Sequence, residues 1–231
     1  MKRLLNFNSS RERLYLENKA FAKAVPEGSL VLDAGAGNQP YKFLFEHAKY
    51  ESADFEQVDK SYAKSTYVCN LDDIPVEDNR YDFILFNQVM EHLPDPSTVL
   101  KELFRILKPS GKILYTGPLF YEEHEQPFDF YRYTQFGLRK LFTDAHLNIE
   151  RLDWLEGYFG TIAYQFRSIY KYLPLKPKKI GNGFTRYLVI PLFLLVKLTS
   201  LVLSILFHKL EMKYKFCSKG YPKNYIAILK K

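Results

Sequence analysis

The residue types that could do chemistry gather first in a short acidic, glycine-rich turn, Asp33-Ala34-Gly35-Ala36-Gly37. The turn follows the apolar segment Ser29-Leu30-Val31-Leu32, which has the length of a buried strand. Small residues after a strand let the backbone bend sharply and bring main-chain N–H groups close to a ligand. Asp33 adds a carboxylate that can order the turn or accept a hydrogen bond from an ammonium group. This combination predicts a cofactor site.

Phosphate-bearing cofactors fit this turn poorly. A dinucleotide fingerprint needs a third glycine for close packing of helix on strand, but Gly37 is followed by Pro40. No phosphate-loop lysine follows, and the carboxylate of Asp33 would repel a pyrophosphate. The turn therefore favours a ligand with an ammonium group and no phosphates. An ordinary strand-to-turn connection, with glycines required only by backbone geometry, stays open as the alternative.

Further motifs follow this turn in a fixed order. They are VLDAGAGNQPY, YESADF, NLDDIP, YDFILFNQVMEHLPDP and LFRILKPSGKILYT. In order and spacing the chain resembles class I methyltransferases that use S-adenosylmethionine (SAM), most closely the type 11 family. The resemblance covers residues 28–118 and continues loosely to about residue 157. It implies a Rossmann-like methyltransferase fold and SAM as the methyl donor.

The resemblance also implies roles for individual residues. Asp54 would accept hydrogen bonds from the ribose hydroxyls, unless it is only a solvated turn acid. Asn70 stands where the family usually has an acid beside the adenine, so it would accept from the adenine amino group without charge assistance. We interpret His92 of the Glu91-His92 pair as structural. The predicted cofactor residues are Asp33, Gly35, Ala36, Gly37, Asp54, Asn70, Leu71, Asn87 and Gln88.

The methyl acceptor is expected beside the loop that follows the strand Lys112–Thr116, because ligands bind at the carboxyl ends of parallel strands. In this loop His124 is the candidate general base and Arg132 the candidate group for holding an anionic acceptor. The segment HEQPFDFYRYT resembles the corresponding family loop but does not assign the base. In the alternative, Asp129 and Arg132 pair to order a lid and His124 is merely exposed. Cysteine spacing gives no metal motif, and none is expected.

Alternating strand and helix patterns predict an α/β fold with a doubly wound, mostly parallel seven-stranded sheet. A capping box of Ser9 and Glu12 predicts the start of the first helix. A hydrophobic helical insertion precedes the last strand. The expected domains are a SAM-binding core over 1–160, the insertion over 161–215 and the last strand over 216–231. The expected strands cover 29–32, 50–54, 66–69, 81–86, 112–116, 148–155 and 224–229, and further helices cover 41–48, 96–107 and 138–145.

Charge divides the chain sharply. Residues 1–163 carry 19 Lys and Arg against 25 Asp and Glu, whereas residues 164–231 carry 14 against the single Glu211. An anionic partner for this end of the chain follows, either a nucleic acid or a membrane surface. The basic residues flank a long aliphatic segment and lack groove-reading elements, which argues against a nucleic acid. We expect a lipid surface instead.

The aliphatic segment over 187–207 has one charge in 21 residues, long enough in principle to span a bilayer. Placing Pro191 at the start of its helix leaves about sixteen residues, which favours an interfacial helix. Lys197, Ser200, Ser204, His208 and Glu211 recur at helical spacing and predict one polar stripe. The alternative is a helix that covers the protein internally. Basic residues expected to face anionic headgroups are Lys176, Lys178, Lys179, Arg186, Lys209, Lys213 and Lys215.

These patterns predict a SAM-dependent methyltransferase that acts near a membrane on a small-molecule, lipid or lipid-linked glycan acceptor. We expect it in the cytoplasm, in peripheral contact with the inner face of the membrane. The competing hypothesis is a catalytically silent, membrane-associated scaffold that retains the methyltransferase fold, and the unusual Asn70 is its main support.

Overall fold

The computed structural model describes residues 7–58, 62–176 and 183–231, without the side chains of residues 185 and 186. The chain forms two compact units, which we call the sheet unit (Arg13–Leu155 and Asn224–Lys231) and the helical unit (Met1–Glu12 and Glu156–Lys223). The chain therefore leaves the sheet unit after β6 and returns to it only for the last strand. The chain changes units after residues 12, 155 and 223, whereas the sequence suggested boundaries after residues 160 and 215.

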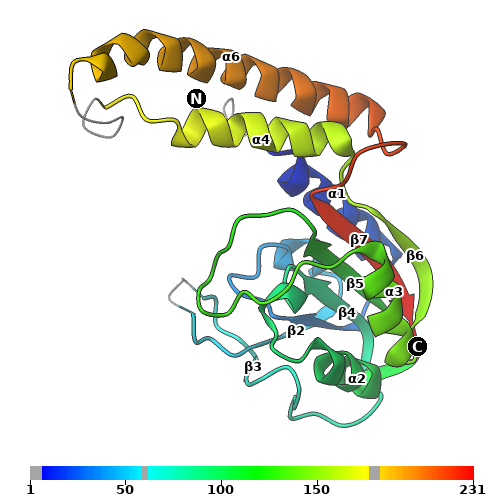
Figure 1. The fold of residues 1–231 in the computed structure, drawn as a ribbon. Coiled ribbons are helices and arrows are strands. Elements are labelled where there is room, and N and C mark those ends of the chain that lie inside the picture. Colours follow the sequence, from blue (N-terminus) through cyan, green and yellow to red (C-terminus); the bar gives the residue numbers. More distant parts are fainter. Residues whose placement is uncertain (1–6, 59–61, 177–182) are drawn as a thin grey trace. The chain divides into compact units, whose positions relative to one another are not determined.

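The sheet unit holds a seven-stranded sheet in the order β3-β2-β1-β4-β5-β7-β6 (Figure 1). Only β7 runs against its neighbours, pairing antiparallel with both β5 and β6. This order confirms the predicted mostly parallel fold with an apolar helix before the last strand. The strands are β1 (Leu30–Ala34), β2 (Lys49–Asp54), β3 (Tyr67–Val68), β4 (Tyr81–Asn87), β5 (Leu107–Pro118), β6 (Asn148–Trp154) and β7 (Asn224–Lys230).

Helices cover both faces of this sheet. The central strand β4 is a nearly continuous apolar run, as expected for a parallel strand buried on both sides. Leu103 and Phe142 pack on one face, whereas Leu14 and Phe45 pack on the other. The helices and 3₁₀ turns are α1 (Ser9–Ala24), η2 (Lys42–Phe45), η3 (Met90–His92), α2 (Pro96–Ile106), α3 (Gln135–Asp144), α4 (Tyr158–Tyr172) and α6 (Thr185–Tyr214).

Two local predictions are wrong for identifiable reasons. Helix α1 begins at Ser9 as predicted, but Asn8 provides the cap by accepting from the Arg11 N–H at 3.2 Å. The Ser9 hydroxyl instead bonds Nδ1 of His208 at 2.9 Å, so no capping box forms. The helix predicted over 41–48 is only the short turn η2, because the carbonyl of His47 must already accept from Gly28 ahead of β2.

The helical unit contains α4 and α6, which lie side by side (Figure 1). Phe159 and Phe166 on α4 pack against Phe207 on α6 at ring distances of 5.7 and 5.8 Å. Glu211 is fully buried and accepts hydrogen bonds from the N–H groups of Gly157 and Gly160 at the start of α4. A carboxylate at a helix N-terminus is electrostatically favourable and occupies amide groups that the helix itself leaves unpaired.

Helix α6 differs from the sequence-based expectation at its start. It begins at Thr185, so Pro191 lies inside the helix. The estimate of sixteen apolar residues after a proline start is therefore wrong. Over Tyr187–Tyr214 the helix is long and apolar enough to cross a membrane by length and composition, which alone is weak support for membrane contact. Only 11% of its most apolar 18-residue stretch is buried, unlike the core helix of a soluble protein.

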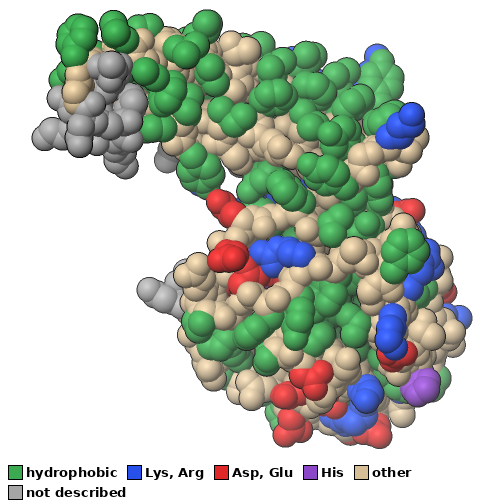
Figure 2. Space-filling model, in the orientation of Figure 1, with side chains coloured by type: hydrophobic (Ala, Val, Ile, Leu, Met, Phe, Trp, Pro, Cys, Tyr) green, Lys and Arg blue, Asp and Glu red, His purple; other side chains and the backbone are tan. Residues whose placement is uncertain are grey.

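The predicted polar stripe of α6 exists and faces inward. Ser200, Ser204 and His208 are buried together with Glu211. Lys197 donates to the carbonyl of Leu173 at the C-terminus of α4, at 3.1 Å. The apolar faces of α6 are consequently exposed, and Figure 2 shows hydrophobic side chains crowded over this helix.

Candidate functional site

The turn after β1 has a backbone that only glycine suits. Gly35 has a φ of +76°, and a Cβ there would lie 2.4 Å from Cγ2 of Val89. Gly37 has a φ of +52°, again in the left-handed region. Close approach of Val89, two residues after the end of β4, thus accounts for Gly35.

The amide groups of this turn are occupied within the protein. The N–H groups of Gly35 and Ala36 donate to the carbonyl of Ala53 at 2.8 and 3.2 Å. Gly37 donates to Oδ2 of Asp54 at 2.8 Å. A phosphate site at such a turn would need these amides free. Their internal pairing agrees with the prediction of a ligand without phosphates.

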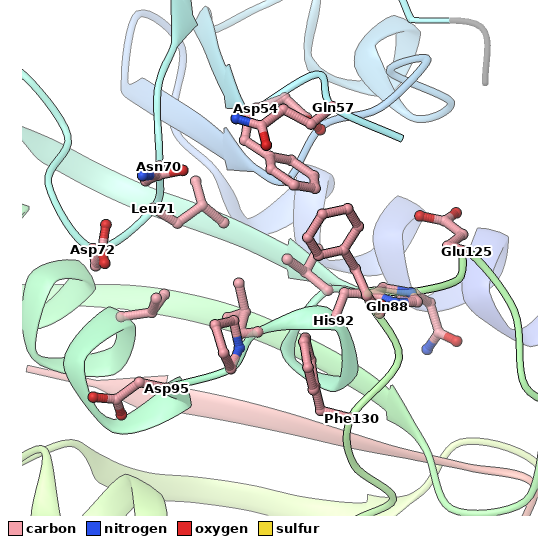
Figure 3. Close-up of a pocket in the computed structure, with 17 residues that line it drawn as sticks. Asp54, Gln57, Asn70, Leu71, Asp72, Gln88, His92, Asp95, Glu125 and Phe130 are labelled. Carbon is pink, nitrogen blue, oxygen red and sulfur yellow. Dashed lines mark hydrogen bonds between the residues drawn. The ribbon is translucent and has the colours of Figure 1, made fainter. Parts of the chain in front are cut away.

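A pocket opens beside this turn, where the loops after β1, β2, β3, β4 and β5 meet (Figure 3). It encloses about 1020 Å³ of empty space, its open mouth included. Its described lining contains acids, amides, one histidine and apolar or aromatic groups, with neither lysine nor arginine. The lining residues are Gly35, Asp54, Phe55, Gln57, Asn70, Leu71, Asp72, Gln88, Val89, His92, Leu93, Pro94, Asp95, Val99, Glu125, Phe128 and Phe130.

The acidic lining of the pocket favours cationic ligands over anionic ones. Carboxylates without a neighbouring cation attract a positively charged group and repel phosphates. SAM carries a sulfonium and an ammonium group, and its adenosine offers hydroxyl and amino donors. An acidic, phosphate-excluding pocket with apolar walls therefore fits SAM on the chemistry of its own side chains.

Asp33 and Asp54 follow adjacent strands and differ in their position. Asp54 lines the pocket, with its Oδ1 accepting from the Glu56 N–H at 3.1 Å. Asp33 lies outside the lining, where Tyr50 donates to its Oδ2 at 2.5 Å. Burial raises the pKa of Asp33 to about 6, the Tyr50 hydrogen bond opposes this shift, and the charge of Asp54 adds to it.

Two amides at the end of β4 have different environments. Asn87 lies outside the lining: its amide nitrogen donates to Asn18 at 3.0 Å, and its oxygen accepts from Thr116 at 2.9 Å. Gln88 lines the pocket with a φ of +57°, and its buried Nε2 has no hydrogen-bond partner. A strained residue with an unpaired buried donor is typical of a ligand contact. Asn87 instead ties β4 to its neighbours.

The predicted adenine residues lie together after β3. Asn70 and Leu71 both line the pocket, the first exposed and the second buried. Asp72, which the sequence reasoning missed, lines it too (Figure 3). A carboxylate thus stands two positions after Asn70. The NLDDIP motif contained this signal, since it holds two acids directly after Leu71.

The acceptor-loop candidates lie outside the pocket lining. Arg132 makes a two-pronged contact with Asp129 at 2.6 and 2.8 Å and also donates to the carbonyls of Tyr131 and Glu122. These hydrogen bonds lower the pKa of Asp129 to about 2. The geometry therefore matches the lid-ordering alternative for Arg132. His124 donates its backbone N–H to Asp129, and its ring packs edge-on against the His92 ring at 4.6 Å.

The Glu91-His92 pair lies deeper than its motif suggested. His92 lines the pocket, and its Nδ1 is 2.5 Å from the carbonyl of Phe128. Glu91 is buried, and neither carboxylate oxygen has a hydrogen-bond partner. Burial raises the pKa of Glu91 to about 8.

Aromatic residues complete the pocket, and the sequence did not identify them. Phe55 and Phe128 meet edge to face at 5.4 Å, joining the loop after β2 to the loop after β5. Phe130 lines the same wall. Their motifs, YESADF and HEQPFDFYRYT, were visible, but which loop side chains turn inward depends on tertiary contacts.

Comparison with known proteins agrees with this geometry. A family model described as a methyltransferase domain matches residues 7–157, and the chain belongs to this family. SAM is the methyl donor of the class, which confirms the predicted cofactor. The fold is similar to that of a SAM-dependent methyltransferase from Archaeoglobus fulgidus, with a TM-score of 0.56 and 15% identity over 96% of this chain and 94% of that one.

Curated relatives match only part of the chain. An uncharacterised protein from Methanocaldococcus jannaschii is 26% identical over 52% of this chain and 62% of its own length. A demethylmenaquinone methyltransferase from Bacillus licheniformis is 27% identical over 39% of this chain and 45% of its own length. The chain therefore spans less than two thirds of either relative.

Proposed function

We propose that the chain is a SAM-dependent methyltransferase that binds an anionic membrane through its helical unit and methylates an acceptor carried by that membrane. The acceptor class is a lipid, a quinone or a lipid-linked glycan. One observation carries the membrane part: the polar stripe of α6 is buried within the helical unit while its apolar faces are exposed. This is the reverse of a surface helix in water.

The exposed surface of α6 is suited to a bilayer. Each Leu or Val gains about 0.3–0.6 kcal/mol at the bilayer centre, while an unpaired lysine costs about 2.5–3.5 kcal/mol. Lys197 is already bonded to the Leu173 carbonyl, which reduces that cost. The large apolar side chains that α6 exposes are Tyr187, Leu188, Leu192, Leu194, Leu195, Val196, Leu198, Val202, Leu206 and Tyr214.

Basic residues flank this apolar surface. Lys209 and Lys213 are exposed near the end of α6, and Lys176 is exposed before its start. Each such residue near an anionic surface contributes about 1 kcal/mol. Lys178 and Lys179 lie outside the described residues, as does the side chain of Arg186. Together, an apolar helix and basic flanks favour anionic lipid over a neutral bilayer.

The lining of the pocket supports a proposal for how SAM, the methyl donor, is held. Bound SAM supplies a methyl group already activated by its sulfonium, so the protein mainly aligns the acceptor. Asp54 is proposed to hold the ribose hydroxyls, Asn70 or Asp72 the adenine amino group, and Gln88 the methionine portion. Phe128 and Phe130 offer an apolar wall for the acceptor. The demethylmenaquinone methyltransferase among the relatives supports a quinone within this acceptor class.

Transfer of radiolabel from SAM tests the proposal. The acceptors are a membrane lipid extract reconstituted into vesicles and the same extract dispersed in detergent. We expect label in the organic phase, with the L192N/L195N/V202N variant losing transfer to vesicles and keeping transfer in detergent. Absence of label with both acceptors would support the silent scaffold.

A matched variant controls for surface polarity. Phe43, Val68 and Phe136 on the sheet unit are 57%, 65% and 74% exposed, close to the 57%, 62% and 65% of Leu192, Leu195 and Val202. The F43N/V68N/F136N variant should bind anionic vesicles like the wild type. Equal losses of vesicle binding in both variants would contradict a specific role for α6.

A further inference from the structure

Glu91, His92 and His124 form a cluster that SAM binding does not explain. One ligand atom from each of the three side chains lies within 4.8 Å of the others. Glu91 comes from η3, as does His92, while His124 comes from the loop after β5. Residues far apart in sequence thus bring two imidazoles and a carboxylate to one place.

The Glu91 carboxylate lacks the partners that a buried acid needs. Its side chain is 1% exposed, and neither oxygen has a hydrogen-bond partner. Leaving a buried polar group unpaired costs about 1–3 kcal/mol, and more for a charged one. Such a group in a folded protein indicates a missing cation or another ligand. Oε1 of Glu91 lies 3.8 Å from Nε2 of His92, on the side where the cluster meets.

Both imidazoles are oriented as metal ligands are. Nδ1 of His92 is 2.5 Å from the Phe128 carbonyl, so this nitrogen carries the proton and Nε2 keeps its lone pair. Nδ1 of His124 is buried without a hydrogen-bond partner and lies 3.4 Å from Oδ2 of Asp129. Ligating histidines usually hydrogen-bond their second nitrogen to a carbonyl or a carboxylate, as His92 does; beside His124 the carboxylate of Asp129 is close but not hydrogen-bonded to the ring.

We propose that Glu91, His92 and His124 bind a divalent transition-metal ion, with Asp129 orienting His124 from outside the ligand set. Two histidines and one carboxylate suit Zn²⁺, Fe²⁺ or Co²⁺ and disfavour Mg²⁺, which prefers oxygen ligands. Three protein ligands leave coordination positions open. Since His92 lines the pocket, an acceptor oxygen can reach them. A metal ion here would replace the free imidazole base expected at His124.

Metal binding is measured on the full chain, free of affinity tags and stripped with a chelator. Calorimetric titration with Zn²⁺ should saturate at one ion per chain, and Co²⁺ should give visible absorption bands. Mg²⁺ should give no heat of binding. Glu91→Gln and His124→Gln should each weaken Zn²⁺ binding by about tenfold or more. The control variant His146→Asn changes an exposed histidine of the same unit and should bind like the wild type.

SAM binding is measured on the same samples, because the metal's role in catalysis rests on the proposed function and its binding does not. His124→Gln should bind SAM within about twofold of wild type, which shows that the pocket remains folded. A folded wild-type chain that binds SAM but neither Zn²⁺ nor Co²⁺ would overturn the metal site alone. Unchanged metal binding in both Glu91→Gln and His124→Gln would overturn it as well.

Discussion

The two units of this chain differ in which side chains they bury. In the sheet unit apolar strands are buried and charged groups line the open pocket, as in a water-soluble enzyme. In the helical unit Ser200, Ser204, His208 and Glu211 are buried and leucines are exposed. We propose that the exposed apolar faces of α6 form an interaction surface. This contrast is the basis of our proposal that the helical unit contacts lipid through the exposed faces of α6.

The largest effect is expected from Gly35→Ala in the sheet unit. Its added Cβ would lie 2.4 Å from a Val89 methyl carbon at a φ of +76°. Left-handed backbone costs about 1–2 kcal/mol for a residue with a Cβ, and displacement of Val89 adds to it. We expect SAM affinity to fall by about 100-fold or more in calorimetry. Gly183→Ala, whose Cβ meets no atom, is the control for positive φ alone; equal SAM affinity in the two variants would contradict the account.

Glu211→Ala tests the inverted interior of the helical unit. The substitution leaves the N–H groups of Gly157 and Gly160 without their buried acceptor. Each unpaired buried donor costs about 1–3 kcal/mol, so we expect a loss of about 2–4 kcal/mol in the free energy of unfolding by denaturant. Lys213→Ala, an exposed neighbour on α6, should lose under about 0.5 kcal/mol. Similar losses in the free energy of unfolding of both variants would contradict the claim that the buried Glu211 stabilises this unit.

The double variant Lys209→Gln/Lys213→Gln tests whether the basic residues of the helical unit contribute to binding of anionic membranes. Two charges near an anionic bilayer contribute about 2 kcal/mol, so affinity for phosphatidylglycerol vesicles should fall by about 30-fold in co-sedimentation. Affinity for neutral phosphatidylcholine vesicles should not change. Replacing Lys101 and Lys140 of the sheet unit, both exposed, is the matched control. An equal fall with this control would mean that net charge, rather than the helical unit, selects the membrane.

The smallest effect concerns pH. The pKa of Asp33 is raised to about 6, with Tyr50 and Asp54 as its titratable neighbours. Below pH 6 the carboxyl is mainly protonated. Above pH 6 the ionised Asp33, although outside the lining, adds a negative charge beside Asp54 and so strengthens the attraction of the pocket for a cationic ligand. SAM affinity should therefore rise about tenfold from pH 5 to pH 7 and vary less in Asp33→Asn. An equally steep profile in Asp33→Asn would remove Asp33 from the role that the sequence suggested.

Much of the fold could be predicted because each strand of the sheet carries its own signal. The buried run of β4 and the Asp95 cap of α2 are both local patterns, and both elements lie where they were expected. Short connections were harder. Residues 41–48 read as a helix, yet the backbone is held by the contact of Gly28 with His47, which no local pattern contains.

The site could be predicted in part. Gly35, Asp54, Asn70, Leu71 and Gln88 line one pocket, and their contacts with SAM stay predictions. The other predicted residues lie outside its described lining, and the side chains of Asp33, Asn87 and Arg132 are hydrogen-bonded elsewhere. Strand order places residues at the ligand edge of a sheet, but it does not decide which of two consecutive side chains turns inward.

Periodicity could not predict whether the polar face of α6 is buried against protein or exposed to water. Spacing correctly grouped Ser200 with Ser204, His208 and Glu211 on one face. Whether that face meets water or protein depends on α4, whose N-terminal amides need Glu211. Without knowledge of α4, the same polar stripe is therefore compatible with a helix whose polar face is exposed and with one whose polar face is buried.

The account depends most directly on SAM binding in the acidic pocket of the sheet unit. Calorimetry of the full chain with SAM and with S-adenosylhomocysteine should give saturable binding of one ligand per chain. Asp54→Ala should weaken it by about tenfold or more, while Glu150→Ala, an exposed acid on β6, should not change it. Folded protein that binds neither ligand, or an Asp54→Ala variant that binds both like the wild type, would contradict the central claim.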